Sequence, residues 1–381
     1  MIYLDYNGST PVDPRVAEQV EVISASYANP SSTQHTPGRE AAELIEEARH
    51  RVASFALSRP RDVIFTSGAS EAATIGIVGA MLGAPDRPNV VVGATEHKAI
   101  LAAADLGARL TGGQVRLVRV LQSGELDLNH LESVVDQTVS LVAAMSANNE
   151  TGVIHPLRAA GEVAARSGAA FFVDVTQLAG KGPLDEASAA ADLMVCSSHK
   201  MYGPKGAGAL IADRHVQARL VPLFAGGGQE RGLRGGTQNT SAIAGFGLAA
   251  ELAAKEVTAD EARLKSLAST LYEVLDSSIP GVVELNGSKE NRLPNTLNLR
   301  FMGADADAVM ASMPDVAVSS GSACQSAVPT QSHVLLAMGC SEIEASESLR
   351  ISLGRPTTES EVNCATERIV DAVTRVRELS A

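Results

Sequence analysis

The sequence predicts an α/β protein in which a large domain with a mainly parallel sheet is followed by a smaller α+β domain. Between residues 62 and 212, short apolar runs alternate with stretches of helical spacing. Runs that are apolar on both faces indicate strands covered on both sides, and their alternation with helices is typical of a parallel sheet. After residue 280 the pattern changes to short strands, helices and loops, which indicates a second domain.

The first 14 residues are predicted to form an arm that packs with the small domain. Residues 3–6 are strand-like, and residues 7–11 have the composition of a turn. A polar loop begins at Asn29. Residues 38–55 then carry apolar side chains at helical spacing, which predicts an amphipathic helix.

The strands of the large domain are predicted from apolar runs that helical segments, such as 159–167, connect. In a parallel sheet of this kind the active site lies at the carboxyl ends of the strands. The runs are residues 63–66, 90–92, 139–145, 170–173, 193–196 and 209–211.

A glycine-rich loop at 225–240 ends the sheet region, and a long helix from about 241 toward 275 is the predicted connector to the small domain. No internal repeat is visible along the chain. The predicted division is an arm at 1–14, a large domain at 15–250 and a small domain at 251–381.

The composition argues against several classes of protein. The net charge of −13 opposes charge-driven binding to nucleic acid. No apolar segment approaches the ~20 residues of a membrane span, and the N-terminus does not resemble a secretion signal. Because the cysteines form no C-x-x-C pair, we expect no metal site and no disulfide scaffold. A cytoplasmic protein fits this pattern, with its four cysteines at Cys196, Cys324, Cys340 and Cys364.

A lysine stands between a predicted strand and a turn rich in glycine and proline. The strand at 193–196 is followed by two serines and His199, and Lys200 then leads into the turn. An amine held by a turn among hydroxyls and an imidazole is a candidate for Schiff-base formation. An exposed lysine in an ordinary connection is the alternative, and this stretch alone leaves both open.

Polar side chains follow other predicted strands at the same edge of the sheet. At 66–71, backbone N–H groups at a helix start, together with Ser67 and Ser70, would bind a phosphate, although an ordinary helix cap is the alternative. Asp174 ends a buried strand and needs a cationic partner, which the ring nitrogen of pyridoxal phosphate would supply, although a helix-capping or salt-bridged aspartate is the alternative. His97 follows another strand and would stack on a flat cofactor, or be structural.

Two candidates lie in the small domain. Cys324 sits among small polar residues at 318–326, where an accessible thiol would act as a nucleophile if its thiolate is favoured. Arg350 lies in a strand-like segment at 349–355, and its guanidinium would bind a carboxylate in bidentate fashion. A surface salt bridge is the alternative for the arginines of this segment.

Taken together, segments along nearly the whole chain resemble the cysteine desulfurases, which are pyridoxal-phosphate enzymes with the class V aminotransferase fold. The resemblance implies a large domain with a seven-stranded type of sheet between helices and a smaller α+β domain. It rests on residues 3–6, 29–32, 65–71, 96–98, 148–152, 198–206, 226–231 and 319–324.

The resemblance also implies roles for individual residues. Lys200 would form the Schiff base with the cofactor, Asp174 would pair with its ring nitrogen, Gln177 would contact its ring oxygen, and His97 would stack on the ring. Cys324 would accept sulfur from L-cysteine as a persulfide and pass it to an acceptor protein, leaving L-alanine. Residues that would hold the phosphate are Ala69, Ser70, Ser197, His199 and, from the partner subunit of a homodimer, Thr237, while Asn149, Arg350 and Asn29 would bind the substrate.

Departures from the family pattern keep some alternatives open. Residues 7–10 differ from the usual arm, Ser70 replaces a usual threonine, and the chain ends at Ala381 without the extension that housekeeping members use to dock an iron–sulfur scaffold. Segments such as 292–296 also resemble selenocysteine lyases, but the loop at 319–333 has the length seen in desulfurases. A class V aminotransferase using no thiol and a non-catalytic binding module are further alternatives. The acceptor would serve iron–sulfur assembly, tRNA thiolation, cofactor synthesis or DNA sulfur modification.

Overall fold

A computed structural model describes residues 1–320 and 331–380 of the chain. Its centre is a seven-stranded sheet in the order β2-β8-β7-β6-β5-β3-β4. Only β8 runs antiparallel to its neighbours, so the predicted fold class is confirmed. The strands are β2 (Val63–Thr66), β3 (Asn89–Gly93), β4 (Val115–Val118), β5 (Val139–Met145), β6 (Ala170–Asp174), β7 (Leu193–Ser197) and β8 (Gly208–Ala212).

Helices cover both faces of this sheet, and a separate apolar core lies on each side. One core is formed with α3 (Ala69–Leu82) and α4 (Lys98–Thr111). The other is formed with α2 (Thr36–Phe55), α6 (Leu157–Ser167) and the first part of α9 (Thr240–Ser278). The sheet is therefore buried on both faces, which is why its strands read as continuous apolar runs.

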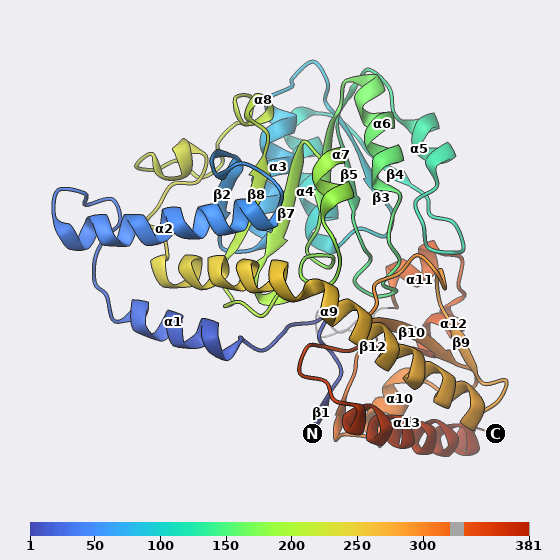
Figure 1. The fold of residues 1–381 in the computed structure, drawn as a ribbon. Coiled ribbons are helices and arrows are strands. Elements are labelled where there is room, and N and C mark those ends of the chain that lie inside the picture. Colours follow the sequence, from blue (N-terminus) through green and yellow to red (C-terminus); the bar gives the residue numbers. More distant parts are fainter. Residues whose placement is uncertain (321–330, 381) are drawn as a thin grey trace.

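The smaller unit is built on an antiparallel sheet in the order β12-β10-β9, with strands Ser348–Ser352, Thr296–Phe301 and Val283–Leu285. Helices α10 (Ala306–Ser312), α13 (Glu359–Ser380) and the second part of α9 pack on it and contribute to its core. The 39-residue α9 thus contributes to the cores of both units, and Figure 1 shows it passing from α2 to α13.

The arm belongs structurally to the small unit, although it comes first in the sequence. Strand β1 (Ile2–Tyr3) pairs in parallel with β11 (Val316–Ala317), and Leu4 is fully buried in the small core. The exact domain boundaries expected from the sequence stay a prediction.

The remaining elements are short, apart from α1. These elements are α1 (Pro14–Ser24), α5 (Leu128–Val134), α7 (Asp185–Ala190), α8 (Arg214–Gln217), α11 (His333–Ala337), α12 (Glu342–Ser346) and the 3₁₀ helices η1 (Pro60–Asp62), η2 (Ser198–Lys200) and η3 (Gln229–Gly232).

No helix among residues 1–320 and 331–380 is long and apolar enough to cross a membrane.

Candidate active site

A cavity of about 570 Å³ lies at the carboxyl ends of the central strands, where sequence analysis places the site. Side chains from the large sheet, from the arm and from β12 meet in it. The predicted residues that line it are Ala69, Ser70, His97, Asn149, Asp174, Gln177, Ser197, His199, Lys200 and Arg350.

Lys200 is held against the arm. Strand β7 delivers the chain to η2, and Lys200 at its end donates from Nζ to the backbone carbonyls of Asn7, at 2.5 Å, and Gly8, at 2.7 Å. Tyr202, with a left-handed φ of 65°, turns the chain just after it. The site therefore includes backbone groups of the arm that the sequence did not identify as site residues.

Asp174 ends β6 and is buried, with 8% of its surface exposed. Its Oδ1 accepts the backbone N–H of Thr176 at 2.9 Å, which fixes the carboxyl at the cavity wall. Thr176 also lines the cavity, and its buried Oγ1 has no hydrogen-bond partner within the described residues. A buried hydroxyl without a partner is unusual in a native protein and is suited to a ligand.

His97 is the N-cap of α4, and its Nδ1 accepts the N–H of Ala99 at 3.1 Å. Burial lowers the pKa of this imidazole, so it is neutral and its proton lies on Nε2. His199 faces Ser9 of the arm at 3.1 Å between Nδ1 and Oγ, and burial, with the charge of Lys200, lowers its pKa to about 4. The cavity thus holds two imidazoles that are uncharged at neutral pH.

The start of α3 forms another part of the wall. Ser67, Gly68, Ala69 and Ser70 line the cavity, and the first N–H groups of a helix have no acceptor within the helix. Gly208 of β8 packs closely here, since a Cβ on it would lie 2.6 Å from the Cα of Gly68. This backbone, together with the serine hydroxyls, is suited to an anion such as a phosphate.

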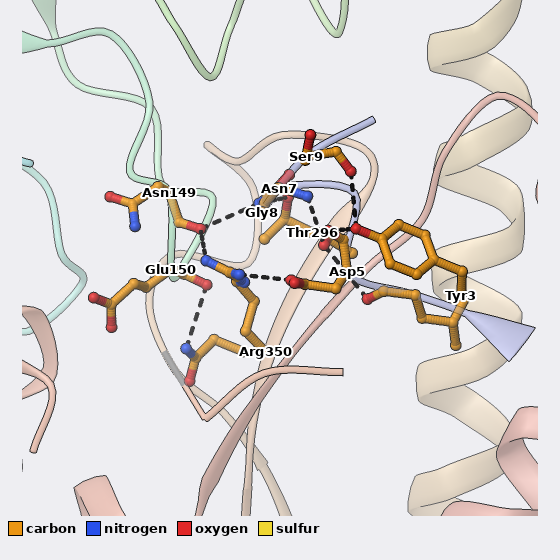
Figure 2. Close-up of polar contacts among 12 residues, drawn as sticks. Tyr3, Asp5, Asn7, Gly8, Ser9, Asn149, Glu150, Thr296 and Arg350 are labelled. Carbon is orange, nitrogen blue, oxygen red and sulfur yellow. Dashed lines mark hydrogen bonds and ion pairs between the residues drawn. The ribbon is translucent and has the colours of Figure 1, made fainter. Parts of the chain in front are cut away.

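Arg350 lies on β12 and lines the cavity, and Figure 2 shows its contacts with Asp5 and Asn149. Its Nη2 donates to Asp5 Oδ1 at 2.6 Å, and its Nη1 donates to the backbone carbonyl of Asn149 at 3.1 Å. Its Nε is buried and has no partner among the described residues. The guanidinium is therefore oriented by the protein while one donor is left for a further acceptor.

Two contacts attach α11 to the large unit beside the cavity. Ser332, the N-cap of α11, donates to the buried carboxyl of Glu150 at 2.5 Å. Burial raises the pKa of Glu150 to about 7. His333 lies 3.0 Å from the backbone carbonyl of Glu96 through its Nε2.

Three predicted site residues are not brought to this cavity by the described structure. Asn29 is exposed, and its Oδ1 accepts the N–H of Ser31 in its own turn. Thr237 is exposed in the loop after η3. Cys324 lies outside the described residues. Of the other cysteines, Cys196 is buried in the core, where burial raises its thiol pKa to about 12, so it is not a nucleophile.

Comparisons with known proteins agree over almost the whole chain. A family model described as aminotransferase class-V matches residues 2–364. A cysteine desulfurase of Frankia sp. (strain EuIK1) is 48% identical over 392 residues, covering 100% of this chain and 93% of the relative. The cysteine desulfurase IscS of Anaeromyxobacter sp. (strain Fw109-5) is 41% identical, covering 100% of this chain and 94% of the relative. Among solved structures, a NifS-like protein is similar with a TM-score of 0.89 at 32% identity, covering 98% of this chain and 99% of that one.

Proposed function

This chain belongs to the class-V aminotransferase family and is a pyridoxal-phosphate-dependent cysteine desulfurase, and from that premise we propose how its residues divide the reaction. Lys200 is the lysine that binds the cofactor, and Cys324 receives the sulfur. The observation that carries the proposal is the meeting of Lys200, Asp174, His97 and Arg350 in one cavity at the carboxyl ends of the strands.

The residues present fit the cofactor. The start of α3 with Ser70 suits the phosphate, and the unpartnered Oγ1 of Thr176 supplies a polar group where a ligand would lie. Asp174 would hold a proton at the ring nitrogen, and the neutral imidazole of His97 suits stacking. When bound, pyridoxal phosphate supplies an electron sink for negative charge at the substrate α-carbon.

The protein's own groups then orient the substrate and move its proton. Arg350 would bind the carboxylate of L-cysteine through its unpartnered Nε, with Asn149 beside it. The amine of Lys200 would remove the α-proton, because it lies in the same cavity, where its Nζ donates to backbone carbonyls of the arm.

Cys324 would complete the reaction as a thiolate. It would attack the substrate sulfur, so that an S–S bond forms and the substrate C–S bond breaks, with the electron pair of that bond left on the substrate carbon. Protonation of this β-carbon, together with return of a proton to the α-carbon, gives L-alanine, and the enzyme retains the sulfur as the Cys324 persulfide. The persulfide then passes its terminal sulfur to an acceptor thiol.

We further propose a homodimer in which Thr237 contacts the phosphate of the partner's cofactor. Within its own chain Thr237 is exposed and does not line the cavity. Its loop is nevertheless anchored firmly, since Arg234 pairs with Glu71 at 2.8 Å and Glu230 is buried.

The three described cysteines form no disulfide, which fits a reducing compartment, and we place the protein in the cytoplasm.

The test compares purified wild type with Cys324→Ala, Lys200→Ala and Cys340→Ala. Absorbance in the visible range reports the cofactor, and sulfide under a reductant and alanine are measured together after L-cysteine is added. Wild type and Cys340→Ala should be coloured and form equal amounts of both products. Cys324→Ala should be coloured but inactive, and Lys200→Ala should lose the Schiff-base absorbance and the activity. Full activity of Cys324→Ala, or a colourless wild type that the cofactor cannot reconstitute, would contradict the proposal.

A further inference from the structure

A second lysine lies behind the cavity wall and takes no part in the mechanism above. Lys181 is 6% exposed, and its Nζ donates to Asn7 Oδ1 at 3.0 Å and to Gln177 Oε1 at 2.5 Å. Both acceptors are neutral amide oxygens, and no carboxylate forms an ion pair with Lys181 within residues 1–320 and 331–380. A buried amine without a counter-ion is costly, so its position needs a reason.

The lysine contacts fix one orientation of a side chain that does line the cavity. Gln177 Nε2 donates to the backbone carbonyl of Asn7 at 3.0 Å. A carbonyl only accepts, so the amide nitrogen must face Asn7, and the amide oxygen must face the Lys181 donor. Both ends of the amide therefore select the same one of its two possible flips.

This orientation leaves one donor for the cavity. A glutamine amide has two N–H groups, and Asn7 takes only one of them. If Lys181 were absent, the buried Oε1 would lose its donor and the amide would be held from one side only.

We propose that Lys181 is a positioning residue that holds the Gln177 amide with an N–H toward the ring oxygen of the cofactor, and so favours negative charge on that oxygen. The inference deepens the proposed function and rests on it, because it needs the bound cofactor of that proposal and the contact of Gln177 with its ring oxygen that the family resemblance implies.

The effect is readable in the pH titration of the bound cofactor. A donor to the ring oxygen stabilises the charged, deprotonated form of that oxygen. Loss of the donor should therefore move the midpoint of the visible absorbance change to higher pH. Loss of one ordered hydrogen bond predicts a shift of about half a pH unit or more. The titratable and charged groups that face this network are Lys200 and His199 from η2, Arg350 from β12 and Asp174 from β6.

The central variant is Lys181→Met, which keeps a long unbranched side chain and removes the donor. Cofactor-loaded wild type, Lys181→Met, Gln177→Leu and the double variant are titrated by absorbance. We expect upward shifts in both single variants and no further shift in the double variant, because the lysine acts through the glutamine. Lys265→Met, at an exposed lysine of α9 that does not line the cavity, is the matched control and should titrate like wild type.

Two further variants keep the test informative if Lys181→Met does not fold. Lys181→Arg retains a donor and should restore the wild-type midpoint. Asn7→Ala removes one acceptor of Lys181 while keeping the lysine and the backbone carbonyl, and should give a smaller upward shift.

The outcomes separate this inference from the proposed function. A Lys181→Met protein with the wild-type midpoint, or a double variant whose shift is the sum of the singles, overturns the role of Lys181 and leaves the desulfurase proposal standing. Gln177→Leu with an unchanged midpoint overturns the inference as well, because the amide would then not contact the ring oxygen. A wild type that binds cofactor but forms no alanine from cysteine overturns the proposed reaction instead, and the titration still tests Lys181.

Discussion

Two arginines with nearly buried side chains serve the molecule in different ways. Arg49 of α2 and Arg350 of β12 are 6% and 4% exposed, and each pairs with a carboxylate. Arg49 donates to both oxygens of Glu230, to the carbonyl of Val63 and, through Nε, to Glu46. Arg350 leaves its Nε without a partner in the described part of the chain, and this arginine is the one at the cavity.

The difference between the two arginines lies in their donors and in where they stand. All three nitrogens of Arg49 have acceptors, its carboxylate partner has a fully buried side chain, and its guanidinium lies 4.8 Å from the ring centre of Phe65. Each guanidinium nitrogen of Arg49 is therefore already bonded within the protein. Arg350 pairs with a carboxylate that is 26% exposed and keeps a buried donor in reserve.

Breaking the Arg49 pair should have the largest effect on stability. Glu230→Ala leaves a buried guanidinium without its partner, and we expect the free energy of unfolding to fall by about 3–5 kcal/mol. Thermal or denaturant unfolding measures this. Glu47→Ala removes a partner of the more exposed Arg51 and should change stability by less than about 1 kcal/mol. Equal effects of the two variants would remove the contrast drawn here.

Glu150 extends the comparison to a buried carboxyl without an ion-pair partner at 4 Å or less among the described residues. Its pKa is about 7 in the folded protein against 4.5 ordinarily, so the folded state binds more protons between these values. Stability should therefore decrease as the pH rises from about 4.5 through 7, by at most on the order of 3 kcal/mol.

The measurement for Glu150 is the melting midpoint as a function of pH. Glu150→Gln keeps an acceptor for Ser332 and should remove the pH-dependent contribution of this carboxyl to stability. The melting midpoint of the variant should therefore rise relative to that of wild type as the pH increases. Glu43→Gln, at an exposed position of α2, supplies the baseline. A wild type and a Glu150→Gln variant with parallel pH profiles would show that this carboxyl does not titrate differently on folding.

Conservative changes of the two arginines should separate binding from stability. Arg350→Lys loses the Nε donor and the planar guanidinium, and we expect kcat/KM for L-cysteine to fall about 100-fold, or about 2–3 kcal/mol, with little change in melting. Arg49→Lys should do the reverse, lowering the melting midpoint while the folded enzyme keeps its KM. The proposal for Arg350 fails if its lysine variant keeps a normal KM.

The smallest expected effect concerns Asp5, which competes for the guanidinium that the substrate would use. Asp5→Asn keeps an acceptor for Nη2 and removes a negative charge next to the incoming carboxylate. Because Asp5 is partly exposed, we expect KM for L-cysteine to decrease by only about 2–5-fold. Steady-state kinetics at two salt concentrations measure it, and an increase in KM would mean that Asp5 chiefly orients Arg350.

Sequence patterns predicted the part of the fold that depends on local burial. The runs at 63–66 and 139–145 match β2 and β5, and the helix expected from about 241 toward 275 is α9 (Thr240–Ser278). Strand β4 was missed because it lies at the sheet edge, where partly exposed side chains break the continuous apolar pattern. Family resemblance, confirmed by the comparisons, supplied the function, whereas the roles of single residues remain predictions.

The contacts that complete the site could not be predicted from local patterns. The Asn7 side chain bonds Thr296, and its backbone N–H bonds Ser352, residues that lie far along the chain. Lys181 gave no sequence signal either, since an isolated lysine in a turn reads as exposed. Such contacts depend on how the small unit is placed against the large one, which local periodicity does not encode.

The pairing of β1 with β11 has a consequence for synthesis of the protein. The carbonyls of Asn7 and Gly8 that hold Lys200 are translated before the strands of the large sheet. Their anchors at Val316 and Ser352 come more than 300 residues later. On the ribosome the large sheet is able to form while the arm is still unattached, so cofactor capture should follow translation of β12. An affinity tag fused before Met1 would therefore be attached to a strand that pairs only after β11 has been translated.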